Sequence, residues 1–198
     1  MSNKDLRECI QSILECLGAG TGEDVFRQGL LDTSNRVSEA LSFMTSGYKQ
    51  SPKDVLKTFE DGASGYDELI FQGSIPFYSL CEHHLLPFFG VAHIGYIPNG
   101  KIVGLSKLVK LVDIFARRLQ VQERATTQIL DALDDTLNPM GAGVVLCCRH
   151  LCMESRGVRT QGTVTITSAI RGVLKDSASA KAEFMGLVSL CNSRGAVI

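Results

Sequence analysis

The sequence predicts an α+β fold in which a helical N-terminal region precedes four strands and three further helices. Two observations lead to this prediction. Apolar residues recur at helical spacing in the first third of the chain, whereas runs rich in valine, isoleucine and threonine fill much of the rest. The central elements follow the order strand, strand, helix, helix, strand, strand. This order favours an antiparallel four-stranded sheet with the two central helices packed on one face.

The first 67 residues are expected to form a helical region without catalytic residues. Three stretches have the apolar spacing or capping residues of helices: 4–17, 25–31 and 33–43. The following residues are polar and include Pro52, so they predict loops with one short helix. We therefore expect one boundary after residue 67, with residues 68–198 forming a single structural unit.

The later part of the chain alternates between strand and helix patterns. Four runs predict strands: 69–78, 88–97, 143–153 and 162–173. Three runs predict helices: 108–119, 123–137 and 180–190. The turn signal Pro98-Asn99-Gly100 predicts a hairpin whose second strand covers residues 101–105, and Ser106 stands where a helix N-cap is expected.

Composition excludes several classes of partner. The net charge is −1, so no overall positive field attracts nucleic acid or an anionic membrane, and we expect neither partner. No apolar run approaches the roughly 20 residues that span a bilayer, and the polar start is unlike a secretory signal. We therefore expect a cytoplasmic protein, in which the seven cysteines are thiols or metal ligands.

The sharpest local feature is the tetrapeptide Cys81-Glu82-His83-His84. A cysteine and a histidine three positions later can converge on one tetrahedral metal, and Zn²⁺ is the usual choice for mixed sulfur and nitrogen ligands. The alternative is a chance cluster, with a free cysteine at a strand end beside two surface histidines. The tetrapeptide alone leaves both interpretations open.

A second group lies in the predicted strand 143–153. Strand alternation predicts that Cys148, His150 and Cys152 face the same way, where they can complete a site begun by Cys81 and His84. The alternative is that the adjacent cysteines in this strand are small core residues. Three protein ligands would leave a position for water and make the site catalytic, but spacing does not show whether three or four are used.

Three further patterns are weaker signals. Ser106 and Lys107 begin a predicted helix, and helix N-termini suit phosphate, with Lys110 adding charge one turn later. Glu123, between two helices, can accept two hydrogen bonds from a guanine edge or simply cap a helix. Arg156 is either a phosphate-binding fork or a solvated surface arginine.

Together these segments resemble successive motifs of the GTP cyclohydrolase I family, in the family's order and at its separations. The resemblance covers nearly the whole chain. It rests mainly on six segments: Ser79-Leu-Cys-Glu-His-His-Leu-Leu-Pro-Phe-Phe-Gly90, Gly104-Leu-Ser-Lys107, Arg117-Arg-Leu-Gln-Val-Gln-Glu-Arg124, His150-Leu-Cys-Met153, Arg156-Gly-Val158 and Thr165-Ile-Thr-Ser168.

The resemblance implies the tunnelling fold, whose subunits join their sheets edge to edge into a barrel, and a homodecamer of two stacked pentamers with active sites between subunits. It implies that Cys81, His84 and Cys152 bind Zn²⁺. The catalytic residues it implies are His83, His150 and Ser106. The substrate-binding residues it implies are Gln122, through its backbone, and Glu123 for guanine, with Lys107, Lys110 and Arg156 for the triphosphate or ribose end.

The implied reaction converts GTP to 7,8-dihydroneopterin triphosphate. Zinc-activated water attacks guanine C8, and His83 protonates the ring nitrogen. Formate leaves, the ribose rearranges and the ring recloses as a pterin.

The sequence departs from the family pattern at a few positions. Lys110 replaces the usual arginine, Glu154-Ser155 replaces a mostly apolar pair, and Arg171 replaces a common apolar residue. Two alternatives keep the fold: a related GTP-processing enzyme with another product, and an inactive regulatory homologue. A redox thiol protein is disfavoured because the chain lacks a Cys-x-x-Cys pair.

Overall fold

The computed structural model describes residues 3–193, which divide into two compact units, one ending at Ser46 and one beginning at Gly47. The expected boundary after residue 67 lies inside the second of these units and stays a prediction. No helix within residues 3–193 has the length and apolar character needed to cross a membrane.

The first unit consists of two helices, α1 (Asn3–Thr21) and α2 (Thr33–Met44), as the first and third helical patterns predicted. The helix expected over residues 25–31 is wrong, because that segment forms turns. The Asp24 carboxylate accepts a hydrogen bond from the Phe26 N–H at 2.9 Å, and the Leu30 N–H bonds to the Arg27 carbonyl three residues back. The Leu30 N–H thus bonds three residues back, as in a turn, whereas an α-helix bonds four residues back.

The second unit contains the sheet and its covering helices. The short 3₁₀ helix η1 (Ser46–Lys49) begins one residue before this unit does. The other elements follow in chain order: α3 (Pro52–Val55), β1 (Thr58–Phe59), β2 (Ile70–Cys81), β3 (Pro87–Ile97), β4 (Ile102–Val103), α4 (Leu105–Ala116), β5 (Leu119–Gln120), α5 (Gln122–Leu137), β6 (Gly141–His150), α6 (Leu151–Glu154), β7 (Thr165–Gly172), α7 (Val173–Asp176) and α8 (Ala178–Ser193).

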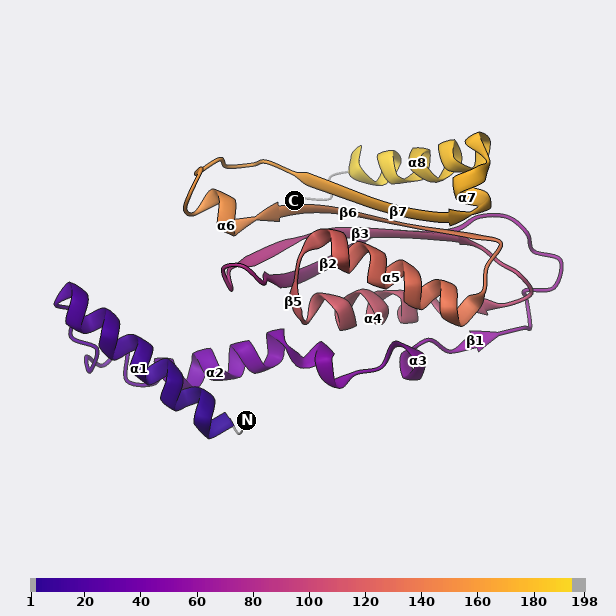
Figure 1. Ribbon diagram of the computed structural model, residues 1–198. Helices are drawn as coiled ribbons and strands as arrows, with labels where there is room; N and C mark the ends of the chain where they lie inside the picture. Colours follow the sequence, from indigo (N-terminus) through magenta and orange to yellow (C-terminus); the bar gives the residue numbers. More distant parts are fainter. Residues whose placement is uncertain (1–2, 194–198) are drawn as a thin grey trace. The chain divides into compact units, whose positions relative to one another are not determined.

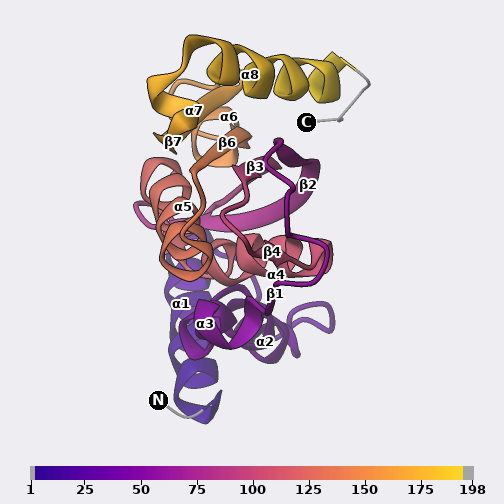
Figure 2. The same ribbon diagram turned by 90° about the vertical axis from the view of Figure 1, so that its right-hand side faces the viewer.

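The main sheet has the strand order β5-β2-β3-β6-β7. Its four long strands are antiparallel, whereas the two-residue β5 pairs in parallel with the end of β2. Helices α4 and α5 cover one face, and α8 lies on the opposite face (Figures 1 and 2). The predicted α+β class, with a four-stranded antiparallel sheet and two helices on one face, is therefore confirmed, and the short β5 is an addition to it.

Each face of the sheet has its own apolar core. The larger core lies between the sheet and helices α4 and α5, and the periodic residues of these helices supply much of it: Leu108, Leu111, Val112, Phe115, Ala125, Ile129, Leu130, Leu133 and Leu137. On the other face, Phe184 and Val188 of α8 pack with Val91 and Val145 of the sheet. Burial of these side chains attaches all three helices to the sheet.

The expected hairpin of residues 88–97 with 101–105 is wrong. Strand β4 pairs with β1, and the neighbours of β3 are β2 and β6. The buried Tyr96 hydroxyl accepts a hydrogen bond from the Val103 N–H at 3.1 Å, so a side chain takes the place of a strand partner. The N-cap position of α4 is Gly104, two residues before the expected Ser106, which lies in the first turn.

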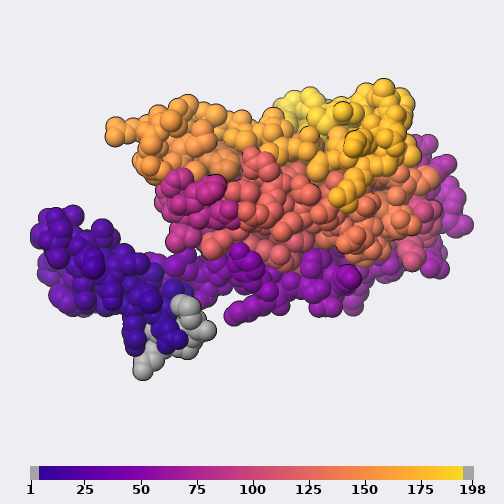
Figure 3. All heavy atoms as spheres, in the orientation of Figure 1, coloured from indigo at the N-terminus to yellow at the C-terminus, as the bar shows by residue number. Residues whose placement is uncertain are grey.

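Several features converge at one end of the sheet. The turn joining β2 to β3, strand β5, the start of α5 and helix α6 all lie there (Figure 1). In the space-filling view, the orange segment that follows β6 protrudes at this end (Figure 3). The short connection from β6 to α6 and the tight turn from β2 to β3 therefore bring distant parts of the sequence together.

Candidate functional site

The turn between β2 and β3 brings its cysteine and histidines together. The Cys81 N–H donates to the Leu86 carbonyl at 2.9 Å, while the Cys81 carbonyl accepts from the N–H groups of His84 and Leu85. Leu85 has a φ of +54°, the left-handed conformation that lets so short a segment reverse. Cys81 is buried at the strand end, whereas the two histidines lie on the exposed turn.

Cys152 reaches this turn from a helix. Strand β6 ends at His150 and α6 begins at Leu151, so the expectation that Cys152 follows strand alternation is wrong. Even so, Cys81, His84 and Cys152 come together, with one ligand atom from each lying within 4.8 Å of the others. Cys148 remains in the larger core and is not part of this group.

The spacing of these atoms suits a tetrahedral metal. The Cys81 Sγ atom lies 3.7 Å from His84 Nδ1. In a zinc site with bonds of about 2.3 Å to sulfur and about 2.0 Å to nitrogen, such a pair lies roughly 3.6 Å apart. Two thiols and an imidazole are also ligands that zinc prefers. The residues present therefore fit a bound metal of this kind.

The Cys152 thiol holds its proton more tightly than an ordinary cysteine. The pKa of Cys152 is raised, chiefly by burial and next by the Cys81 thiol, whereas the nearby Arg156 lowers it. A cysteine binds a metal as the thiolate. Metal affinity at this group should therefore fall as the pH falls.

His150 lies beside this group, at the end of β6. Its ring stacks on Phe88, with 4.8 Å between ring centroids and an interplanar angle of 6°. Its Nε2 atom lies 2.8 Å from the side-chain oxygen of Gln122. Burial lowers the pKa of His150, and the negative charge of Glu123 opposes that effect. His150 is thus held on two sides while Glu123 lies close enough to influence its charge.

An ion pair attaches the turn to the start of α5. The Arg124 guanidinium donates to both carboxylate oxygens of Glu82, at 2.6 and 2.8 Å, and this lowers the pKa of Glu82. The Glu82 N–H also donates to the Gln120 carbonyl at 3.0 Å. Glu123, next to this pair, is exposed in the first turn of α5, where helix N–H groups lack intrahelical partners.

Comparison with known proteins decides the family. The family model described as GTP cyclohydrolase I matches residues 6–189. The chain belongs to the GTP cyclohydrolase I family. It is 58% identical over 166 residues to GTP cyclohydrolase 1 of Janthinobacterium sp. (strain Marseille), covering 84% of each chain. It is 57% identical to GTP cyclohydrolase 1 of Nitrosospira multiformis, covering 84% of this chain and 87% of that protein.

A further relative and one solved structure are also similar to this chain. GTP cyclohydrolase 1 of Chlorobium phaeovibrioides is 50% identical over 185 residues, covering 93% of this chain and 81% of that protein. The solved apo structure of the archaeosine synthase QueF-Like has a TM-score of 0.45 and 18% identity, covering 52% of this chain and 93% of that one. That structural likeness is too weak to carry a functional conclusion. Family membership agrees with the tunnelling fold predicted from the motifs.

One chain does not bring together all the residues expected in a GTP cyclohydrolase I site. Ser106 and Lys107 lie in the first turn of α4, while the C-terminal end of α4 leads to β5, which pairs with Cys81. Twelve helical residues span about 18 Å, so these two residues lie at the far end of the unit from Cys81. Lys110 is exposed one turn further along α4.

Two departures from the family pattern form ion pairs. The carboxylate of Glu154 accepts two hydrogen bonds from Arg149, at 2.8 and 2.6 Å, so this interaction neutralises the carboxylate that the sequence places near Arg156. Arg171 donates to Asp131 and Asp134 of α5. Both substitutions are thus accommodated by opposite charges nearby.

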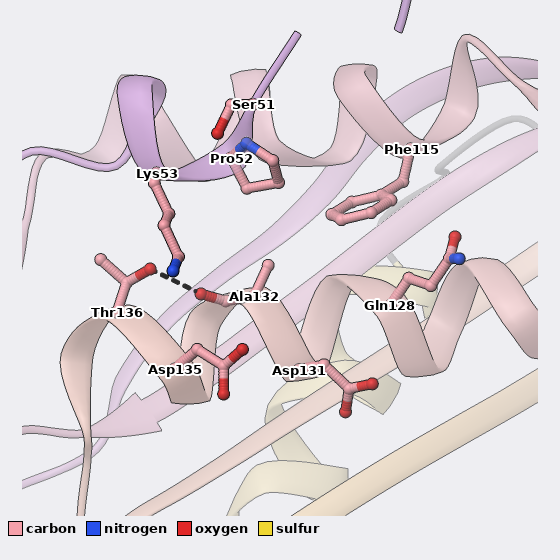
Figure 4. Close-up of a pocket in the computed structure, with 9 residues that line it drawn as sticks. All are labelled: Ser51, Pro52, Lys53, Phe115, Gln128, Asp131, Ala132, Asp135 and Thr136. Carbon is pink, nitrogen blue, oxygen red and sulfur yellow. Dashed lines mark hydrogen bonds between the residues drawn. The ribbon is translucent and has the colours of Figure 1, made fainter. Parts of the chain in front are cut away.

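A pocket of about 280 Å³ lies away from the predicted site residues (Figure 4). It is formed by α3, the end of α4 and α5. In the close-up, Lys53 extends toward Ala132 and Thr136, whose hydroxyl donates to the Ala132 carbonyl at 2.8 Å. None of the residues that line this pocket is a cysteine or histidine. The pocket is therefore separate from the group of Cys81, His84 and Cys152 and offers no comparable metal ligands.

The sequence did not reveal the role of the Gln122 side chain. The residue is 2% exposed, and its side chain contacts His150 from inside the protein. One signal was present: Gln122, Thr126 and Ile129 share the buried stripe of α5 at helical spacing. No sequence pattern indicated the ion pair between Glu82 and Arg124, because the two residues are 42 positions apart.

Proposed function

We propose that this protein catalyses the GTP cyclohydrolase I reaction, the first step of pterin synthesis leading to tetrahydrofolate or tetrahydrobiopterin compounds. GTP is opened at guanine C8, formate is released, the ribose rearranges and the ring recloses to give 7,8-dihydroneopterin triphosphate. Family membership supports this proposal. The observation that carries it is the convergence of Cys81, His84 and Cys152 from two distant segments, beside His150.

We propose Zn²⁺ as the resident metal, held by Cys81, His84 and Cys152. Three protein ligands leave a fourth coordination position open, as catalytic zinc sites require. The chemistry that zinc supplies when bound is Lewis acidity, which makes water reactive near neutral pH.

The histidines would move protons around the opening ring. His83 lies on the exposed turn, with its Nδ1 3.9 Å from Cys81 Sγ, so it can act as the general acid toward the guanine ring nitrogen. His150, held by Phe88 and Gln122, would exchange a proton with the substrate. Glu123 would accept two guanine N–H groups, and free backbone N–H groups beside Gln122 would donate to the base.

The triphosphate site would be completed by a second copy of the chain. Ser106, Lys107 and Lys110 belong to α4, whose start lies at the far end of the unit from Cys81, so one chain cannot bring them to the metal ligands. Arg156, close enough to influence Cys152, would contribute from the same chain as the metal ligands. We propose a homodecamer with active sites between subunits.

The sheet edges support assembly. Within residues 3–193, strand β7 pairs only with β6, so its other side is an open edge. Pairing with a neighbouring copy would close such an edge. We also propose a cytoplasmic location, because all seven cysteines are free and a reducing compartment keeps thiols in that state.

The test is incubation of the zinc-loaded protein with GTP, with formate and the oxidised fluorescent pterin measured in parallel. Production of both, stopped by a chelator and restored by zinc, is the expected result. A different GTP product would identify a related enzyme with another endpoint. Zinc binding without any conversion of GTP would identify an inactive homologue.

A further inference from the structure

The side chain of Gln122 is fixed by four contacts. It is buried at the start of α5, and its Nε2 atom donates to the Leu146 carbonyl at 3.1 Å and the Thr165 carbonyl at 3.0 Å. The Thr167 hydroxyl lies 3.1 Å from the same nitrogen. The side-chain oxygen faces His150 Nε2 at 2.8 Å. Both N–H groups of this carboxamide and one lone pair of its oxygen are therefore engaged within the chain.

These partners determine which end of the amide is nitrogen. A backbone carbonyl can only accept a hydrogen bond, so the two carbonyls require the NH₂ group of Gln122 on their side. The oxygen must then face His150. Because an amide oxygen can only accept, the Nε2 atom of His150 has to carry the proton in this contact.

The hydrogen bonds of two neighbouring hydroxyl groups support the same orientation of the Gln122 amide. Thr126 donates its hydroxyl to the Gln122 backbone carbonyl at 2.8 Å. The 2.6 Å contact between Thr126 and Thr167 must therefore be donated by Thr167. The Thr167 oxygen is then free to share one of the two N–H donors of the Gln122 amide with a carbonyl. Only one assignment of donors and acceptors therefore satisfies all of these hydrogen bonds.

The ring of His150 is also fixed in its plane. It stacks on Phe88 almost in parallel, which opposes tilting. The Nδ1 atom of His150 has no hydrogen-bond partner within the part of the chain that the structure describes. With the proton on Nε2 engaged by Gln122, Nδ1 is the ring atom that remains available.

We propose that Gln122 is a positioning residue that holds His150 as the tautomer with its proton on Nε2, so that Nδ1 presents a lone pair to the substrate. His150 then starts as a proton acceptor: Nδ1 takes a proton from a reacting O–H or N–H group. The resulting imidazolium keeps its Nε2–H bond to Gln122 and returns the Nδ1 proton in a later step. This inference rests on the proposed function for the identity of the substrate, but not for the tautomer.

The kinetic test compares two buried glutamines. In Gln122→Met the size is kept but the contact with His150 is lost. We expect kcat to fall by about tenfold to a hundredfold, part of the roughly 10²–10⁴-fold that a proton-transfer residue supplies, while KM for GTP stays within about threefold. The matched control is Gln120→Met, because Gln120 is also buried and bonds to the Phe115 carbonyl and to Gln128, with no contact to a histidine.

Gln120→Met should lose stability but keep kcat within about threefold of the wild type. Equal losses of kcat in both variants would overturn the positioning role, because loss of a buried glutamine would then suffice. A folded Gln122→Met protein with unchanged kcat would overturn it as well.

A spectroscopic test does not depend on activity or on the folding of any Gln122 variant. The ¹⁵N spectrum of zinc-loaded, histidine-labelled wild-type protein is recorded at about pH 8, above the usual histidine pKa of about 6.5. The His150 signals are assigned by their loss in His150→Gln. We expect a protonated Nε2 and an unprotonated Nδ1 in the wild type, and a mixture of tautomers in Gln122→Met.

A proton on Nδ1 in the wild type overturns the inference. The two levels of the proposal fail separately. If the wild type converts no GTP but His150 carries its proton on Nε2, the proposed function fails and the tautomer assignment stands. If GTP is converted but the wild-type proton is on Nδ1, the function stands and this inference fails.

Discussion

Two buried histidine networks lie on opposite faces of the same sheet. His150 donates to Gln122 toward α5, and His93 contacts Asn192 of α8, at 3.1 Å. The difference is in the second ring nitrogen. His93 Nδ1 accepts the Ser74 N–H at 3.3 Å, so both of its nitrogens have partners inside the protein. A carboxamide partner therefore does not by itself distinguish a catalytic histidine. The distinguishing feature that we propose for His150 is a ring nitrogen left available beside the metal-capable group.

Cysteines also lie on both faces of the sheet, and they differ in the same way as the two histidines. Cys152 lies with Cys81 and His84 in the metal-capable group, partly exposed. Cys147, on the other face, is 1% exposed and contacts the Asn192 amide at 3.7 Å. Burial raises the pKa of both thiols, so that shift does not distinguish them. What distinguishes them is whether other ligands converge on the same point.

The largest expected effect comes from exchanging one cysteine on each face. Cys152→Ser should lose bound zinc and retain roughly one percent or less of the wild-type turnover, because a neutral hydroxyl is a poor substitute for a thiolate ligand. Cys147→Ser is the control and should keep both. Zinc is measured by metal analysis and turnover by formate release. Full activity of metal-free Cys152→Ser would remove the zinc mechanism.

The two histidines should separate catalysis from stability. His150→Gln should lower kcat by about 10²–10⁴-fold, with a loss of unfolding free energy no larger than that of His93→Gln. His93→Gln should cost about 1–3 kcal/mol of unfolding free energy, because it disturbs buried hydrogen bonds, yet keep kcat within about threefold. Denaturant unfolding and steady-state kinetics measure the two quantities. A reversed result would show that the free ring nitrogen is not the distinguishing feature.

Glu123 sharpens the comparison, because its charge influences His150. Glu123→Ala should weaken selection of GTP over ATP by about tenfold to a hundredfold, since the guanine N–H groups lose their acceptor. The oligomer should persist. Asp135→Ala, at the other exposed end of α5, is the matched control and should leave this ratio unchanged. The ratio is read from kcat/KM for each nucleotide, and equal ratios in wild type and Glu123→Ala would contradict the role.

The smallest effect is on the pH dependence of stability. Burial lowers the pKa of His93, against a smaller opposing effect of Asn192. As the pH falls through the ordinary histidine value of about 6.5, the unfolded chain takes up this proton first, so stability is lost until the pH passes the folded pKa. Unfolding midpoints between about pH 8 and pH 5 should therefore fall more steeply in the wild type than in His93→Gln. Parallel curves for the two proteins would contradict this prediction. The group of Cys81, His84 and Cys152 is the same in both proteins, so its own pH dependence cancels in the comparison.

The errors in the sequence predictions have local causes. In the segment 25–31, where a helix was expected, the N–H groups of Leu30 and Thr33 bond to carbonyls three residues back, as in successive turns. Residues 102–103 of the expected strand 101–105 do form β4, but β4 pairs with β1, and the Val103 N–H also bonds to the hydroxyl of Tyr96 near the end of β3. Apolar periodicity does not contain these local hydrogen bonds, and so it could not predict either outcome.

The sequence by itself determined the α+β class, the order of the long strands and the two central helices, and the family, because periodicity and successive motifs are local properties of the chain. It also identified the cysteines and histidines of the site as candidates. Only the tertiary structure decided that Cys152 reaches Cys81 from a helix, that Cys148 stays in the core and that Gln122 faces His150. Those outcomes depend on where a strand ends and on contacts between distant segments, and side-chain packing sets both.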